Sequence, residues 1–201
     1  MNTIQDNITA VILAGGKGRR LEGQDKGFVE INNKPLIEYV IDRISPQVDS
    51  LVINANRNHA RYKEYGYPVI SDDLSGFQGP LAGFSTAMAL VQTSHILSLP
   101  CDAPLIPDDL VSRMLGCLSK ESTPDSIVVA HDGKRLQNIH ALIPISLLQN
   151  LQSFLNNDQR KVEDWYQQQS LIIADFSENA LAFTNINTQK QRQEIEFRLQ
   201  S

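Results

Sequence analysis

The chain has 201 residues, of which 41% are hydrophobic and 20% are charged, a composition typical of a globular protein rather than a disordered or fibrous one. Eighteen Lys and Arg against 23 Asp and Glu give a net charge of −5, which supplies no overall basic field for nucleic acid. The apolar runs are short and the first residues carry no basic, apolar leader, so we expect no membrane span, no secretion signal and a cytoplasmic location. The two cysteines, Cys101 and Cys117, lack metal-site spacing and are expected to be free thiols.

The chain up to Leu118 alternates short apolar strands with amphipathic helices. Ile8 to Leu13 is a continuous, β-branched run that ends at a Gly-rich segment, as a buried strand does. Further strands are predicted at residues 50–53, 67–71 and 95–99, and helices are predicted to begin at Pro35, Pro80 and Pro107. This alternation predicts βαβ units, and therefore a parallel sheet with helices on both faces.

The rest of the chain is less regular but contains the same kinds of element. Strands are predicted at residues 126–130, 141–145 and 171–175, and helices at 147–155 and 162–168, before a polar C-terminal helix. Because no linker, repeat or low-complexity run separates the two parts, we predict one domain over residues 1–201.

A Gly-rich, basic segment (GGKGRR, residues 15–20) directly follows the first strand. Successive glycines let backbone N–H groups converge on an anion, and Lys17, Arg19, Arg20 and Lys26 add charged donors suited to a polyphosphate. The segment follows the carboxyl end of its strand, where open α/β sheets bind ligands. It matches neither the dinucleotide fingerprint nor the P-loop, so hydride transfer and Walker-type hydrolysis are not indicated.

Asp102 is a lone carboxylate just past the strand predicted at residues 95–99. A carboxylate there is well placed to hold Mg²⁺ against phosphate oxygens, because Mg²⁺ takes one or two carboxylates and completes its shell with substrate and water. The same residue would serve equally well to cap the turn that follows. The residues alone leave both interpretations open.

Six short segments carry a more specific signal. In chain order they are LAGGKGRR at 13–20, DKG at 25–27, NANR at 54–57, GPLAG at 79–83, PCDAP at 100–104 and NINT at 185–188. Together they resemble the molybdenum cofactor guanylyltransferase family over most of the chain. The Gly-rich start alone would indicate only the wider nucleotidyltransferase family, and the DKG, NANR and NINT segments narrow the resemblance to the molybdopterin branch.

The resemblance implies an α/β, Rossmann-like three-layer nucleotidyltransferase fold with a mostly parallel central sheet. Within the single domain it implies a nucleotide-binding part at about residues 8–120 and an acceptor-binding part at about residues 121–201. The implied reaction transfers GMP from GTP to the terminal phosphate of molybdenum-bound molybdopterin, with Mg²⁺ as the cofactor and pyrophosphate released. Transient contacts with proteins that deliver or insert the molybdenum cofactor are also expected.

The resemblance also implies roles for individual residues. The implied catalytic residues are Arg19, Lys26 and Asp102. The implied nucleotide-binding residues are Leu13, Ala14, Gly15, Lys26, Asn54, Asp72, Gly79, Gly83 and Asp102. Asp102 is also the implied Mg²⁺ ligand, with Asn187 as a second candidate for the metal. Because the acceptor phosphate is already an anionic nucleophile, the reaction needs alignment and positive charge rather than a Ser/His/Asp relay.

The acceptor half departs from the family pattern. Residues 137–140 (QNIH) stand where a proline-containing segment is expected. His131, His140 and the pair Arg160–Lys161 are candidates for acceptor contacts. We nevertheless expect the two histidines to be solvated loop residues and the basic pair to be a solvated helix start.

Two other functions fit part of the pattern. A cytidylyltransferase acting on molybdopterin, or on a sugar or polyol phosphate, would share the Gly-rich loop and the metal-binding aspartate. A nucleotide-sensing module without turnover would keep the same pocket. The presence of both Lys26 and Asp102 argues against a sensor, which has no leaving pyrophosphate to stabilise.

Overall fold

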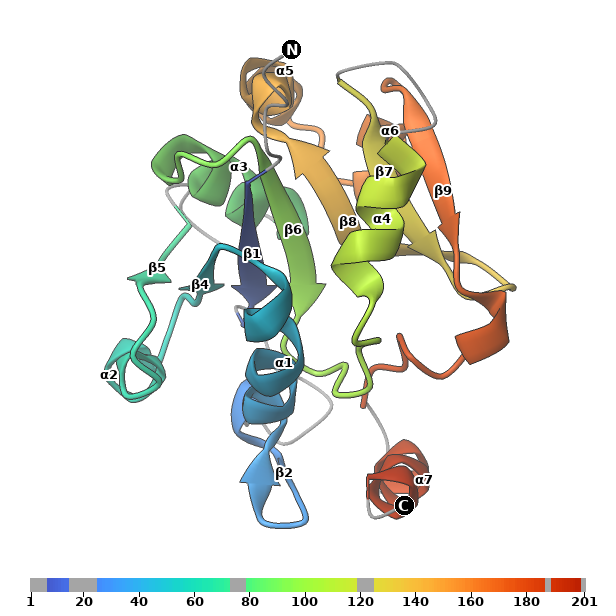
Figure 1. The fold of residues 1–201 in the computed structure, drawn as a ribbon. Coiled ribbons are helices and arrows are strands. Elements are labelled where there is room, and N and C mark those ends of the chain that lie inside the picture. Colours follow the sequence, from blue (N-terminus) through green and yellow to red (C-terminus); the bar gives the residue numbers. More distant parts are fainter. Residues whose placement is uncertain (1–6, 15–24, 73–78, 119–124, 187–188, 200–201) are drawn as a thin grey trace.

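The computed structural model describes residues 7–14, 25–72, 79–118, 125–186 and 189–199. Its centre is a seven-stranded sheet with strand order β5-β4-β1-β6-β8-β7-β9 (Figure 1). The strands are β1 (Ile8–Leu13), β4 (Ser50–Asn54), β5 (Val69–Ile70), β6 (His95–Pro100), β7 (Ile127–His131), β8 (Leu136–Pro144) and β9 (Leu171–Asp175). Only β8 runs antiparallel to its neighbours in this sheet, so the mostly parallel sheet predicted from the sequence is confirmed.

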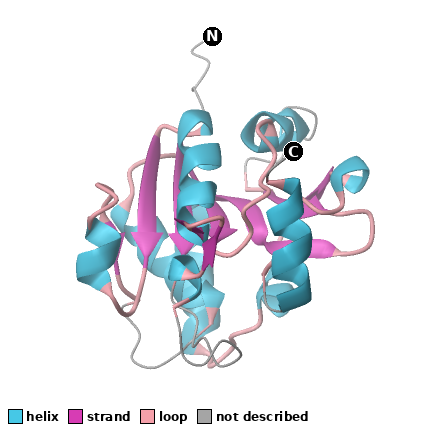
Figure 2. Cartoon of the chain, turned by 90° about the horizontal axis from the view of Figure 1, so that it is seen from below, coloured by secondary structure: helices cyan, strands magenta, loops and turns pink. Residues whose placement is uncertain are grey.

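Helices cover both faces of the sheet and give three layers (Figure 2). One face packs against α1 (Leu36–Ile44), α2 (His59–Lys63) and α4 (Leu110–Leu118). The other packs against α3 (Pro80–Leu90), α5 (Leu148–Asn156) and α6 (Val162–Tyr166). Successive side chains of β1 alternate between these two cores, with Ile12 in the first and Val11 in the second.

The strand ends that matter for function meet at one edge of the sheet, at the bottom of Figure 1. Leu13 at the end of β1 pairs with Asn54 at the end of β4 and with Pro100 at the end of β6. Because β8 is reversed and pairs Ala141 with Ser98, its first residues lie beside the end of β6. A small hairpin of β2 (Glu30–Ile31) and β3 (Lys34–Pro35) packs with α7 (Gln189–Arg198) below this edge.

Some elements differ from the sequence predictions. The segment before α1, for which no element was predicted, contains the 3-10 turn η1 (Lys26–Phe28) and the β2–β3 hairpin, whose two-residue turn places Asn32 and Asn33 at φ 50° and 60°. Helix α2 was not predicted, since its short sequence contributes only Tyr62 to the core. The strand predicted at residues 67–71 is confined to Val69–Ile70, and the helix predicted from Pro107 begins at Leu110.

Strand β8 begins at Leu136, well before the predicted residue 141, because a tight turn joins it to β7. In that turn the Asp132 carboxylate accepts hydrogen bonds from the backbone N–H groups of Lys134 and Arg135, and Gly133 adopts φ +86°. The hairpin geometry is therefore what reverses β8 within the sheet.

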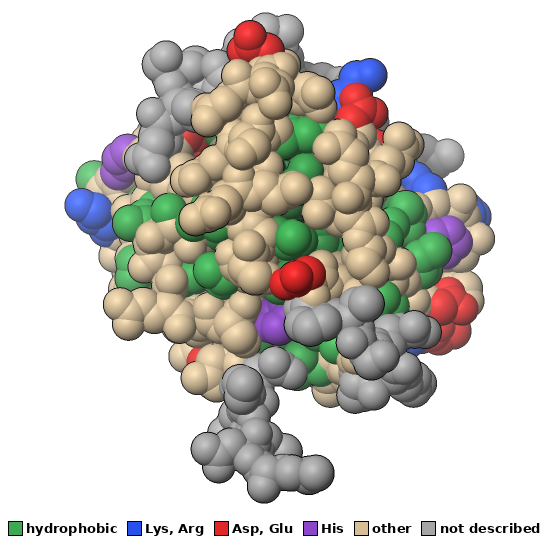
Figure 3. All heavy atoms as spheres, turned by 90° about the horizontal axis from the view of Figure 1, so that it is seen from above, with side chains coloured by type: hydrophobic (Ala, Val, Ile, Leu, Met, Phe, Trp, Pro, Cys, Tyr) green, Lys and Arg blue, Asp and Glu red, His purple; other side chains and the backbone are tan. Residues whose placement is uncertain are grey.

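The opposite face, at the amino ends of the parallel strands, carries hydrophobic and charged side chains without a continuous basic surface among the residues drawn in colour (Figure 3). Within the described ranges, no helix has the length and apolar character needed to cross a membrane.

Further single-turn helices lie at Ser45–Gln47, Ile145–Leu147 and Ser177–Asn179. Cys101 and Cys117 are free thiols, as expected.

Candidate active site

The backbone at the end of β1 is fixed on both sides. The Ala14 N–H donates to the Asn54 carbonyl at 2.8 Å, and the Cys101 N–H donates to the Leu13 carbonyl at 3.2 Å. These bonds extend the ladder just beyond the strands, so the chain leaves the sheet at a defined point on each side of β1. Leu13, Ala14, Asn54 and Asp102, all predicted from the sequence, are thereby brought to one edge.

A hydrogen-bonded cluster joins the ends of β4 and β5. The Asn54 amide donates from Nδ2 to Asp72 Oδ1 at 3.0 Å, and the Asn56 amide donates to Asp72 Oδ2 at 2.7 Å. The Asp72 N–H donates in return to Asn56 Oδ1 at 2.9 Å. Asn54 is buried and Asp72 is half-buried, so this cluster holds a fixed carboxylate near β1. The side chain of Asp72 can accept further hydrogen bonds, such as those of ribose hydroxyls.

Helix α3 approaches the same edge closely because Gly83 has no side chain. A Cβ at this position would lie 2.8 Å from Leu13 Cδ2 and 2.9 Å from Asn54 Oδ1. Gly79 precedes the helix at φ +82°, a conformation that favours glycine, and its added Cβ would lie 3.6 Å from the Arg160 carbonyl. The two predicted glycines therefore set the position of α3 against β1 and of its first turn against Arg160.

Lys26 and Asp102, two of the predicted catalytic residues, form an ion pair. Lys26 Nζ lies 2.7 Å from Asp102 Oδ2 although the residues are 76 positions apart in sequence. The Asp102 side chain is only 5% exposed and that of Lys26 is 26% exposed, so the pair is sheltered but still reachable from solvent. A paired cation and carboxylate at the strand ends form a suitable centre for phosphate chemistry.

Asp25 holds Lys26 in place, a role that the sequence did not reveal. This buried carboxylate caps η1 and is contacted by Gly27 N (3.3 Å), Tyr62 Oη (2.6 Å), Asn58 Nδ2 (2.9 Å) and Arg57 Nε (3.4 Å). Burial, together with the nearby Cys101 thiol and the hydrogen bond to Asp25, raises the pKa of Tyr62 well above its usual value, so Tyr62 stays a donor. The DKG and NANR segments were visible in the sequence, but the contact between Asp25 of one and Arg57 of the other was not.

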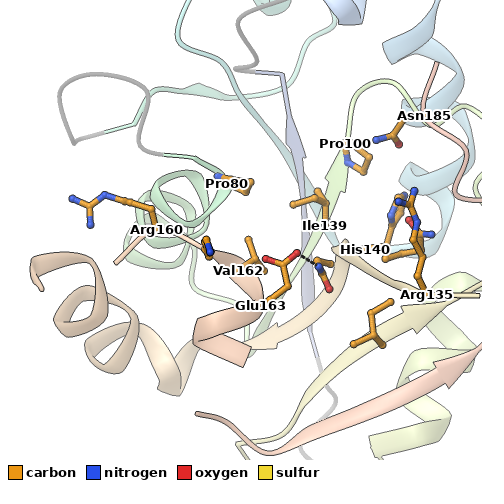
Figure 4. A pocket seen from close by; sticks show the side chains of 13 residues that line it. Pro80, Pro100, Arg135, Ile139, His140, Arg160, Val162, Glu163 and Asn185 are labelled. Carbon is orange, nitrogen blue, oxygen red and sulfur yellow. Dashed lines mark hydrogen bonds between the residues drawn. The ribbon is translucent and has the colours of Figure 1, made fainter. Parts of the chain in front are cut away.

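A pocket of about 350 Å³ opens next to this edge (Figure 4). It is bounded by Pro80 at the start of α3, Pro100 at the end of β6, residues 135–140, residues 160–163 and Asn185. The Ile186 N–H donates to the Asp102 carbonyl at 3.0 Å, which links the Asn185 wall to the Lys26–Asp102 pair. Three cationic residues, Arg135, Arg160 and Lys161, line the pocket.

His140 is not the solvated loop residue that the sequence suggested. It is 2% exposed in the middle of β8, and burial lowers its pKa to about 3, so the imidazole is uncharged. His131 fits the expectation better: it is half-buried, and its Nδ1 accepts the Gly133 N–H at 3.1 Å in the hairpin turn. Arg160 and Lys161 precede α6 as expected but also line the pocket.

The predicted residues Gly15, Arg19 and Asn187 lie outside the described residues. Among the residues that the structure does describe, no three His, Cys, Asp or Glu side chains gather into a metal-binding group. A divalent ion at this site would therefore rely on Asp102 together with substrate oxygens and water, which is the usual arrangement for Mg²⁺.

Comparisons with known proteins agree with this fold. The family model of the MobA-like NTP transferase domain matches residues 10–172, which makes the chain a nucleotidyltransferase. It is 48% identical to the molybdenum cofactor guanylyltransferase of Shewanella loihica and 50% identical to that of Shewanella sediminis, in each case over 94% of this chain and 95% of the other. The chain belongs to the molybdenum cofactor guanylyltransferase family.

Solved structures show the same fold at lower identity. The molybdopterin-guanine dinucleotide biosynthesis protein A of Archaeoglobus fulgidus superimposes with a TM-score of 0.79 at 22% identity, over 96% of this chain and 98% of that one. A nucleotidyl transferase of Methanothermobacter thermautotroptrophicus gives 0.76 at 15% identity, over 97% and 98%. The three-layer nucleotidyltransferase fold implied by the sequence resemblance is confirmed.

Proposed function

We propose that this protein transfers GMP from GTP to the terminal phosphate of molybdenum-bound molybdopterin and releases pyrophosphate. The observation that carries this proposal is the Lys26–Asp102 ion pair, which lies between the predicted nucleotide-binding residues and a pocket lined by cations. The names of the Shewanella relatives support guanine as the base and the molybdenum cofactor as the acceptor.

On the donor side, the nucleotide lies along the ends of β1 and β4. Leu13 and Ala14 offer backbone groups there, and the Asp72 carboxylate fixed by Asn54 and Asn56 accepts hydrogen bonds from the ribose. Gly15 and Arg19 belong to the Gly-rich segment, whose backbone and charge suit the phosphates.

Asp102 fits a Mg²⁺ ion brought in with the nucleotide. Its carboxylate commits Oδ2 to Lys26, and one or two carboxylates are enough when phosphates and water supply the other ligands. The ion would neutralise charge on the phosphates when bound. Asn187 stays a second candidate for the metal.

Lys26 then serves the leaving group. Its ammonium sits on a flexible stem and can leave Asp102 for the negative charge that accumulates on the departing pyrophosphate. The Asp25 network keeps the backbone of η1 fixed while the side chain moves. The acceptor phosphate needs no general base, because it is already anionic, so the chemistry depends on aligning it in line with the α-phosphorus.

On the acceptor side, the pocket beside Pro100 takes molybdopterin. Arg160 and Lys161, just before α6, suit the acceptor's phosphate. The first turn of α3 lies close to Arg160, which brings these two residues next to the nucleotide. Both substrates therefore meet at one edge of a single sheet.

The test is pyrophosphate release with purified molybdenum-loaded molybdopterin, Mg²⁺ and each of GTP, CTP and ATP. We expect GTP to exceed the other nucleotides by at least about 10²-fold in kcat/KM, because a site that hydrogen-bonds one base leaves polar groups unpaired with another. Equal use of CTP and GTP would contradict the guanylyl assignment and favour a cytidylyltransferase. Nucleotide binding without release of pyrophosphate would contradict transfer altogether.

A further inference from the structure

Three polar atoms of the pocket-lining residues are buried without a hydrogen-bond partner. They are Asn138 Oδ1, His140 Nε2 and Asn185 Oδ1. A buried polar atom that lacks a partner destabilises the folded state, so folding alone gives no reason to gather three of them around one pocket. Their common location indicates that a ligand supplies the missing partners.

The chemistry of Asn138 fixes which of its atoms is available. Its Nδ2 donates to Glu163 Oε1 at 2.5 Å, and a carboxylate can only accept, so Oδ1 must be the unpartnered atom. Tyr166 donates to the Asn138 carbonyl at 2.9 Å and holds the backbone. Asn138 therefore offers an oriented hydrogen-bond acceptor between β8, which carries it, and α6, which carries Glu163 and Tyr166.

The imidazole of His140 is held just as firmly. Its ring stands edge-on to Phe183, with centroids 4.8 Å apart and an interplanar angle of 67°. The register of β7 with β8 is irregular between His131–Leu136 and Val129–Ala141, so the residues from 137 to 140 leave the regular ladder. Such irregularities commonly re-aim side chains beside functional sites.

We propose, on the basis of the proposed function, that His140 and Asn138 determine acceptor specificity by accepting hydrogen bonds from the N–H edge of the pterin ring. A 2-amino-4-oxo pteridine presents adjacent N–H donors, which match an imidazole nitrogen and an amide oxygen that accept. The corresponding 2,4-dioxo ring places an oxygen where the amino group was, and two acceptors then face each other. Arg160 lines the pocket at some remove from His140 (Figure 4) and, with Lys161, would meet the phosphate end of the acceptor.

His140 is suited to this task because its imidazole is uncharged. With a pKa of about 3 it stays neutral near pH 7, so its nitrogen can accept a hydrogen bond even among the cations of the pocket.

The test uses 6-hydroxymethylpterin and 6-hydroxymethyllumazine as fluorescent probes in equilibrium titrations without GTP. The wild-type protein should bind the pterin at least about 10-fold more tightly than the lumazine, since the lumazine leaves an acceptor unpaired.

Two variants separate recognition from structure. His140→Phe keeps an aromatic ring against Phe183 but removes the nitrogen, so it should lose most of the 10-fold preference without lowering the unfolding temperature. His140→Gln restores a polar group near the Nε2 position and should recover part of the preference. A histidine that merely supports the core would give the opposite result, with lower stability and unchanged preference.

Asn138→Leu provides a second, independent test, which is available even if His140→Phe fails to fold. This variant should also weaken the preference for the pterin over the lumazine. The inference is overturned if the wild-type protein treats the two probes alike, including binding neither, or if neither variant changes the preference. GMP transfer is measured separately. Transfer by a protein that does not distinguish the probes refutes this inference alone, and a clear pterin preference without transfer refutes the proposed function alone.

Discussion

At the scale of single residues, Lys26 has two different partners in its environment. Its side chain pairs with Asp102, while its backbone belongs to the turn that Asp25 caps. The Asp25 cap holds the backbone of the turn without using the Lys26 ammonium, so the proposed exchange of Asp102 for the leaving pyrophosphate would not require the turn to unfold. This separation of support from chemistry is the basis of the first prediction.

Lys26→Gln should lower turnover by about 10²-fold, the size expected when one preorganised donor to a developing charge is removed. Glutamine can still donate a hydrogen bond to Asp102, so we expect the unfolding temperature to change little. Pyrophosphate release and thermal unfolding would be measured together, with Lys17→Gln as the matched control at a variable position of the Gly-rich motif. Equal kinetic losses in both variants would indicate general electrostatics rather than a specific role for Lys26.

Asp102→Asn should lower turnover strongly, because it keeps the size of the side chain and removes the charge expected to hold Mg²⁺. The expected loss of transition-state stabilisation is several kcal/mol. The measurement is turnover across a magnesium titration. Normal activity at every magnesium concentration would contradict the metal role and leave Asp102 as a residue that only supports the turn after β6.

His140 should make stability depend on pH. Its pKa is about 3 in the folded protein and 6.5 in its ordinary state, so between these values the unfolded chain binds more protons. The free energy of unfolding should therefore fall as the pH drops below 6.5, by up to about 1.4 kcal/mol per unit, and should be unaffected above it. Urea unfolding at pH 7 and pH 5 should show this loss in the wild-type protein and a smaller one in His140→Phe. Parallel losses in both proteins would contradict it.

At the scale of elements, the close approach of α3 to β1 and β4 shapes the edge at which the nucleotide is proposed to bind. Gly83→Ala places a Cβ against Leu13 and Asn54, so the helix must shift; we expect a loss of about 1–3 kcal/mol in stability and weaker GTP binding. Gly116→Ala in α4 is the control, because its added Cβ meets nothing within 4 Å and should stabilise the helix by about 0.5–1 kcal/mol. Chemical unfolding of both variants tests the contrast, and equal effects would show that the close approach is unimportant.

The β7–β8 hairpin has a comparable influence on the acceptor side. Its turn reverses β8 and brings residues 135–140 next to the end of β6, where they form one wall of the pocket. A parallel strand entering from the other end would have placed these residues at the opposite edge of the sheet, away from Asp102.

At the scale of the whole molecule, strands from both halves of the chain belong to one sheet, so the halves should unfold together. The chain has a single tryptophan, Trp165, buried in α6 on the acceptor side. GTP with Mg²⁺ at about 100 times its Kd should stabilise the protein by about 2.7 kcal/mol and raise the unfolding temperature by about 5–10 °C. Trp165 fluorescence and far-UV circular dichroism should report the same shift. If the unfolding temperature reported by Trp165 fluorescence did not rise with GTP, the chain would contain two independently folding parts.

Much of the fold follows from local patterns in the sequence. The continuous apolar run at Ile8–Leu13 and the proline at the start of α3 predict β1 and α3 at their observed boundaries, because burial and backbone geometry act within a few residues. Short elements such as α2 and the β2–β3 hairpin were missed, since each is too brief to show a period. The position of Asp102 after a strand was also visible from the sequence.

The relations between distant residues were decided by tertiary structure. The sequence marked Lys26, Asn54, Asp72 and Asp102 as separate candidates, and only the parallel register of β4, β1 and β6 brought them to one edge. It gave no sign that Tyr62 holds the Asp25 carboxylate that caps the turn of Lys26, or that His140 is buried and uncharged, because burial and hydrogen-bond partners depend on which segments fold against one another. Composition and periodicity act locally and determine elements, whereas the electrostatic state of a side chain depends on neighbours that only the packed chain supplies.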